Sequence, residues 1–167
     1  MVITLSHPGA LRIQTGGLTI VQEGTGAVPA RLKPDIFLRS SRAPIDLPDA
    51  GFIIHGPGEY EIQGIEIRCI APFSYIMKAE DLRIALIPRA DMQLMDHLNR
   101  IDIVFIAEPE NAATFLRQLS PRMVIETGEA AGKIAKELGA AMETADKVTV
   151  KKRDLPSDAM QFTCLTA

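Results

Sequence analysis

The spacing of apolar residues changes its period near Leu82, and this change constrains the fold more than any other feature of the sequence. Before it, short alternating or β-branched apolar runs predict strands at Val2–Leu5, Ala10–Gln14, Leu18–Gln22 and Ile36–Leu38. Gly16 and Gly17 are typical of a hairpin turn, because glycine tolerates the backbone angles that tight turns require. We therefore expect the chain to start with antiparallel strands.

The stretch from Gly51 to Ile70 continues this pattern. It is typical of a strand, a Gly56-Pro57-Gly58 turn, a second strand, a Gly64 turn and a third strand. Successive strands joined by such short turns predict a β-meander.

After Leu82 strands alternate with amphipathic helices, which calls for crossover connections and a layered α/β core. The strands are expected at Arg83–Ile87, Ile101–Ala107 and Met123–Glu126. A first helix is expected from an Asp91 cap through Leu98, and a second from an Asn111 cap to Leu119, with Pro121 just beyond. A third helix is expected because apolar residues recur at helical spacing at Ala131, Ile134, Ala135 and Leu138. Gly139 is expected to end this helix.

The end of the chain is expected to form an antiparallel pair, Lys147–Lys151 with Ala159–Leu165, around the turn Asp154-Leu155-Pro156. No stretch between these elements has the composition of an interdomain linker. We therefore predict a single domain over residues 1–167, a length at which one hydrophobic core suffices.

Charge and hydropathy exclude several classes of partner. The net charge is −3 and the pI is about 5.6, so we expect no cationic surface for nucleic acid. Apolar runs have strand length, so we expect no membrane partner, and no export signal is visible. Cys69 and Cys164 each stand in an apolar, strand-like stretch, which favours buried thiols in a reducing, cytoplasmic compartment.

Three segments carry a resemblance to a known family: MVIT…LRIQTGGLTIV at the start, IIHGPGEYEIQGIEIR from Ile53 to Arg68, and DKVTVKKRDLP from Asp146 to Pro156. The chain resembles the metallo-β-lactamase superfamily, especially its small, lactonase-like branch of zinc-dependent hydrolases. The resemblance implies an α/β fold: a compact four-layer αβ/βα sandwich, with two mixed sheets and helices outside.

The resemblance also implies where a metal centre would lie. The family binds metal through a His-x-His-x-Asp-His loop, and here Ser41, Ala43, Ile45 and Asp46 stand at those positions. The family's later histidine corresponds to Thr127-Gly128, and its bridging aspartate maps near Ile87-Pro88-Arg89, where a cation would oppose metal binding. An early family turn is altered around His7.

The histidine count points the same way. The chain has three histidines, His7, His55 and His97, and no pair has the spacing that presents two imidazoles to one ion. Because a catalytic zinc needs several converging imidazoles and carboxylates, we expect no metal ligands, no catalytic residues and no cofactor.

We therefore expect a non-catalytic protein that serves as a binding, regulatory or assembly module, for a protein partner or a small ligand. The residues expected to remain from the binding site of the family are His7, Ser41, Asp46 and His55. A homo-oligomer is expected by analogy with the family. The alternative is a hydrolase of lactones or phosphodiesters, with zinc held by His7, Asp46 and His55, and a third hypothesis is a structural module that pairs with an active paralogue.

Overall fold

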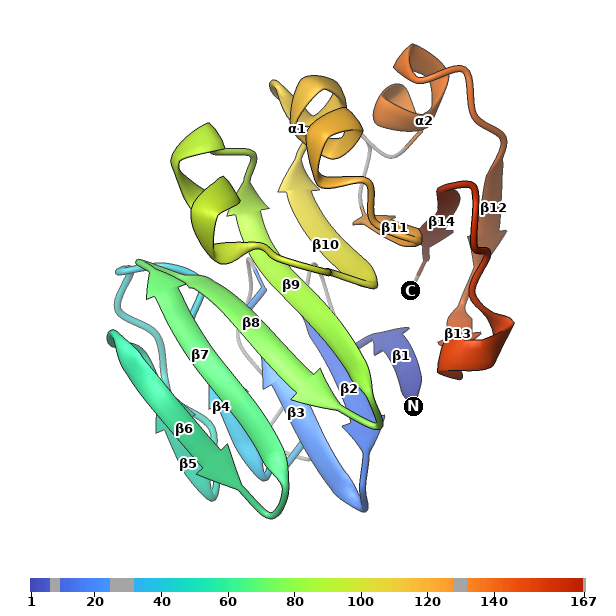
Figure 1. Cartoon of the computed structure of the whole chain (residues 1–167). Coiled ribbons are helices and arrows are strands. Elements are labelled where there is room, and N and C mark those ends of the chain that lie inside the picture. Colours follow the sequence, from blue (N-terminus) through green and yellow to red (C-terminus); the bar gives the residue numbers. More distant parts are fainter. Residues whose placement is uncertain (7–9, 25–31, 128–131, 167) are drawn as a thin grey trace.

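Two mixed β-sheets pack face to face in the computed structural model, which describes residues 1–6, 10–24, 32–127 and 132–166 (Figure 1). The first, sheet A, has the strand order β13 (Lys147–Thr149), β1 (Val2–Leu5), β2 (Leu11–Thr15), β3 (Leu18–Gln22), β4 (Ile36–Leu38), β5 (Phe52–Ile54). The second, sheet B, has the order β12 (Met142–Ala145), β14 (Gln161–Leu165), β11 (Met123–Thr127), β10 (Ile103–Glu108), β9 (Leu82–Arg89), β8 (Ser74–Ala79), β7 (Ile65–Ala71), β6 (Gly58–Ile62).

The main core lies between the facing surfaces of the two sheets. Alternate residues of each strand point into it, such as Ile3 and Ile13 from sheet A and Ile67, Ile84 and Phe105 from sheet B. All of these side chains are buried. Burial alternates with period two in β2 and β7, whereas β4 and most of β9 and β10 are buried on both faces.

Helices cover only one of the two outer faces in the part of the chain that the structure describes. The 3₁₀ helix η1 (Met92–His97), α1 (Ala112–Leu119) and α2 (Lys133–Glu137) lie on sheet B, and Leu94, Phe115 and Ile134 form a second core there. The outer face of sheet A is covered instead by loop residues, since Phe37 packs near Ile45 in the third core cluster. The layers thus match the predicted sandwich except for the expected helices outside sheet A.

The predicted antiparallel start is confirmed for β1, β2 and β3, which pair antiparallel in register. It is wrong for Ile36–Leu38, because β4 pairs parallel with β3, and β5 pairs parallel with β4. The connection from β3 to β4 is far longer than a hairpin turn, and such a connection allows the chain to return to the same end of the sheet.

The predicted meander is confirmed only for its second and third strands, β6 and β7, which pair antiparallel. Strand β8, for which the sequence predicts no element, continues this antiparallel order. The preceding strand, β5, belongs to sheet A. Gly56 and Pro57 therefore lead the chain from one sheet to the other and do not close a hairpin. Both sheets bury similar apolar residues, so the sequence pattern does not distinguish the two outcomes.

The predicted C-terminal pair is also wrong, because its two strands belong to different sheets. Strand β13 pairs antiparallel with β1 in sheet A, whereas β14 pairs parallel with β11 and β12 in sheet B. The turn around the short 3₁₀ helix η2 (Lys152–Asp154) therefore also joins the two sheets. Strand β12 lies in a stretch for which the sequence predicts no element.

The predicted helices are confirmed with small differences. The Asp91 side chain accepts a hydrogen bond from the Gln93 amide, but the helix it caps is a 3₁₀ helix. Asn111 precedes α1 in a left-handed conformation without a side-chain cap bond. Of the third helix, Ile134 and Ala135 are buried as expected, and Ala131 lies outside the described residues. No helix in the described ranges is long and apolar enough to cross a membrane.

Candidate functional site

A cavity of about 390 Å³ opens at the edge of the sandwich where β4, β5 and β7 end. Three short segments form its walls: residues 39–42 after β4, residues 55–57 after β5, and residues 69–73 around the turn from β7 to β8. Cavities of this size bind small molecules in many proteins. The lining residues are Arg39, Ser41, Arg42, His55, Gly56, Pro57, Cys69, Ala71, Pro72 and Phe73.

A buried ion pair holds the first wall in place. The carboxylate of Glu23, whose side chain is 1% exposed, accepts a hydrogen bond of 2.8 Å from Nε of Arg39. The same carboxylate accepts bonds from the amides of Ser40 (2.8 Å) and Ser41 (3.2 Å) and from the Ser41 hydroxyl (3.2 Å). With several donors on one buried carboxylate, the loop after β4 has a fixed conformation.

The guanidinium of Arg39 extends this network along the loop. Its Nη2 donates hydrogen bonds to the carbonyl oxygens of Ser41 (3.1 Å) and Ala43 (2.6 Å). One side chain therefore bridges the end of β3 and the loop 40–43. The charge of Glu23 is balanced within the protein.

Two tyrosines fix the other wall segments. The hydroxyl of Tyr75, a fully buried residue of β8, lies 2.7 Å from the carbonyl oxygen of Arg39 and 3.3 Å from that of Ile54. Burial raises the pKa of Tyr75 well above its usual range, so the hydroxyl stays a donor. The hydroxyl of Tyr60 donates to the Gly56 carbonyl (3.2 Å) and so closes the crossing between the sheets.

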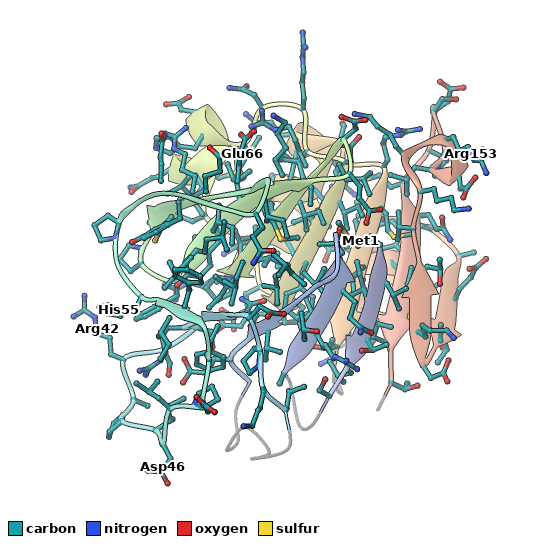
Figure 2. The ribbon with its side chains drawn as sticks, turned by 90° about the horizontal axis from the view of Figure 1, so that it is seen from below. Met1, Arg42, Asp46, His55, Glu66 and Arg153 are labelled. Atoms are coloured by element: carbon teal, nitrogen blue, oxygen red, sulfur yellow. The ribbon has the colours of Figure 1, made fainter. Side chains whose placement is uncertain are left out.

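The open side of the cavity is cationic. Arg42 and His55 are both exposed, and Figure 2 shows them together at one edge of the molecule. No carboxylate is among the described residues that line the cavity. With Arg39 neutralised by Glu23, Arg42 is the charged lining residue without an ion pair among the described residues.

The turn from β7 to β8 gives the cavity an apolar wall and contains a strained residue. Phe73 has a backbone φ of +63°, in the left-handed region that bulky residues rarely occupy. Pro72 precedes it, and both residues line the cavity. Strained backbone conformations of this kind concentrate at ligand-binding sites.

Cys69 lines the inner end of the cavity but is not activated. Burial raises the pKa of its thiol, and its Sγ lies 3.2 Å from the Ala71 carbonyl oxygen. A nucleophilic cysteine requires a lowered pKa. Both cysteines are free and buried, as expected from the sequence.

The structure brings together only part of the predicted site. Ser41 and His55 line the same cavity, whereas Asp46 is exposed and lies apart from His55 (Figure 2). His7 is outside the described residues. The prediction did not include Glu23 and Arg39, although an acidic and a basic residue directly after neighbouring apolar strands were the available signal.

The residues at the family's metal-binding positions do not fit a zinc ion. Ala43 and Ile45 have no donor atoms, and the Ser41 hydroxyl donates to Glu23. No group of three or more His, Cys, Asp or Glu side chains converges within the described ranges. At the other mapped positions, Arg89 is exposed at the end of β9, Thr127 is half-buried at the end of β11, and Gly128 is not described.

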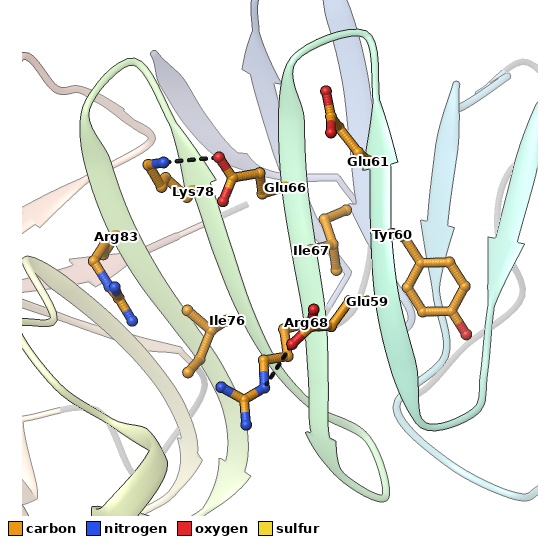
Figure 3. Close-up of a pocket in the computed structure, with 9 residues that line it drawn as sticks. All are labelled: Glu59, Tyr60, Glu61, Glu66, Ile67, Arg68, Ile76, Lys78 and Arg83. Carbon is orange, nitrogen blue, oxygen red and sulfur yellow. Dashed lines mark hydrogen bonds and ion pairs between the residues drawn. The ribbon is translucent and has the colours of Figure 1, made fainter.

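A second hollow, of about 500 Å³, lies on the outer face of sheet B, beyond the helices (Figure 3). Four of its six charged residues form ion pairs: Lys78 contacts Glu66 at 2.7 Å, and Arg68 contacts Glu59 at 3.5 Å. Glu59 and Glu61 lie exposed on one face of β6, which agrees with their interpretation as solvated strand residues. Acids and bases balance here, in contrast to the cavity beside Arg42.

Comparison with solved structures identifies the fold. A structure from Thermotoga maritima, described as a candidate Zn-dependent hydrolase of the metallo-β-lactamase superfamily, superposes with a TM-score of 0.76 at 13% identity and covers 99% of both chains. A diphosphatase of the PhnP family superposes with a TM-score of 0.49 at 10% identity, over 92% of this chain and 79% of that one. No family model and no curated protein matches the sequence. The chain therefore has the metallo-β-lactamase fold, as the sequence resemblance implied.

Proposed function

We propose that this protein is a non-catalytic binding module of metallo-β-lactamase fold that binds a small ligand in the cavity beside Arg39. The observation that carries the proposal is the bond between Glu23 and Arg39. It holds the loop that carries metal ligands in catalytic relatives, so the loop has a structural reason to keep its shape without an ion. Fold alone does not determine activity, and the residues of the site decide it.

The chemistry of the lining residues supports binding over catalysis. The Ser41 hydroxyl donates a hydrogen bond to Glu23, a carboxylate that Arg39 already neutralises, and the Cys69 thiol has a raised pKa, so neither is prepared for nucleophilic attack. A small ligand is favoured over a protein partner because the site is concave and is walled on several sides.

Metal analysis of protein purified without chelator tests the proposal. We expect substoichiometric zinc, manganese and iron, and no hydrolysis of lactone or phosphodiester substrates with any of these metals added. The double variant Asp46→Ala, His55→Ala is expected to have the same metal content as the unaltered protein. A stoichiometric metal that disappears in the double variant would overturn the proposal and favour the hydrolase alternative.

A further inference from the structure

We propose that the ligand of this cavity is a small organic anion with an apolar body, such as an aryl carboxylate or an aryl phosphate. This inference rests on the proposed binding function and adds the chemical class of the ligand. It follows from the separation of charge and apolar surface within the cavity.

The charge of the cavity selects an anion. Arg42 and His55 lie at its open side, and Arg39 lies deeper and is already balanced by Glu23. Because the described lining residues include no carboxylate, a cationic ligand would find no counter-charge there. A guanidinium binds carboxylate and phosphate oxygens in a bidentate manner, so Arg42 can hold either group.

The remaining walls select an apolar body. Pro57, Pro72 and Phe73 line the cavity, together with Ala71 and Cys69. A bare inorganic anion would leave this surface in contact with water. A planar apolar group placed against Phe73 would cover it, with the anionic group at Arg42.

The hollow on sheet B gives an internal comparison. It is of similar size, but three acidic and three basic residues line it, and four of these six form ion pairs, so its formal charges balance. The unbalanced cation of the smaller cavity is therefore not a general property of the surface hollows of this protein. We expect an organic anion to select the cavity beside Arg42.

Titrations of the full chain with four probes test the inference: phenyl phosphate, benzoate, inorganic phosphate and phenol. Binding is measured by calorimetry and located by amide chemical shifts. We expect phenyl phosphate or benzoate to bind about tenfold more tightly than inorganic phosphate and phenol. Inorganic phosphate lacks the apolar body, and phenol lacks the anionic group. The two aryl anions distinguish a phosphate site from a carboxylate site.

Variants test which residues bind the anionic group and which contact the apolar body of the ligand. Arg42→Glu is expected to weaken the tighter aryl anion about tenfold without changing phenol binding. Phe73→Asn, which suits the left-handed backbone at this position, is expected to weaken both aryl anions. Arg153→Glu makes the same charge reversal at an exposed position outside the cavity and should leave binding unchanged.

Three results would overturn the inference: equal affinity for phenol and the aryl anions, unchanged affinity in Arg42→Glu, or no shift of cavity amides with any aryl anion. Phenol binding in the cavity with equal affinity would refute the anionic class and leave the binding function intact. The metal and hydrolysis measurements test the binding function separately.

Discussion

The hydroxyl of Tyr75 in sheet B lies 2.7 Å from the carbonyl oxygen of Arg39, directly after β4 of sheet A. This bond crosses the buried core and ties the loop that forms the cavity to the opposite sheet. Tyr75→Phe removes the donor and leaves a buried carbonyl oxygen without this partner, so we expect the free energy of unfolding to fall by about 1–3 kcal/mol. Urea unfolding measures it. Tyr60→Phe, which removes the longer bond to Gly56 at a half-buried position, should cost less.

The ion pair between Glu23 and Arg39 is predicted to be worth far more than a surface pair. Arg39→Met leaves the Glu23 carboxylate buried without its counter-charge, so we expect a loss of about 3–5 kcal/mol in the free energy of unfolding. Lys33→Met is the matched control, because Lys33 pairs with Asp49 where both side chains are largely exposed, and it should cost less than about 1 kcal/mol. Equal effects of the two substitutions would contradict the role assigned to Glu23.

A double-mutant cycle separates the pair from its parts. In the variant Glu23→Gln, Arg39→Met no buried carboxylate remains, so the combined loss should be smaller than the sum of the single losses. Strictly additive losses in urea unfolding would show that the two side chains act independently.

Gly58 is predicted to be intolerant of a side chain. Its φ is +153°, and a Cβ atom there would lie 3.2 Å from the Tyr60 hydroxyl oxygen. We expect Gly58→Ala to lower the free energy of unfolding by about 1 kcal/mol or more. Gly56→Ala is the control, because a Cβ atom at Gly56 meets nothing within 4 Å. If both alanine variants unfold at the same urea concentration, the backbone conformation and close contact of Gly58 do not contribute to stability as predicted.

Glu126 is predicted to make stability depend on pH. The residue is buried under α2, its Oε2 accepts a bond from the Gly132 amide, and burial raises the pKa of its carboxyl group. The folded state therefore holds this proton more tightly than the unfolded state. The free energy of unfolding falls as the pH rises from the ordinary glutamate pKa through the raised value, and then levels off.

Glu126→Gln keeps an acceptor for Gly132 and removes the ionisation. We expect the difference in stability between this variant and the unaltered protein to shift in favour of the variant over the pH range that begins at the ordinary glutamate pKa and extends above it. Urea unfolding across this range measures the difference, and Glu137→Gln, at an exposed position of α2, should show little such trend. A difference that is independent of pH would contradict the assignment to Glu126.

The local pattern of apolar residues predicted most helices and strands of the fold. It did not predict which strands pair when they are far apart in the sequence. The strands of the first half follow from their alternating or β-branched apolar residues, and β2 shows the alternation of burial most clearly. Phe52–Ile54 and Lys147–Thr149 form the two edge strands of sheet A, beside strands that local pattern does not identify as their partners. Their own residues are compatible with either sheet.

The candidate site was predicted in part for a similar reason. The family resemblance predicted the loop at Ser41 as the site region and the loss of the metal ligands there. Glu23 has no counterpart in that metal motif, and its role depends on burial and on the amides of Ser40 and Ser41, which only the folded chain brings to it. A side chain that holds a loop in place by hydrogen bonds leaves no motif of its own in the sequence.

The pairing of β1 with β13 also determines the order in which the protein can fold. Val2 pairs with Thr149, and Figure 1 shows the two strands side by side although nearly the whole chain separates them. Sheet A therefore keeps an open edge at β1 until the ribosome has released residue 149. Because contacts between distant residues slow folding, the chain should reach its native state late in synthesis and refold slowly from denaturant, with β1 exposed to other chains in the interval.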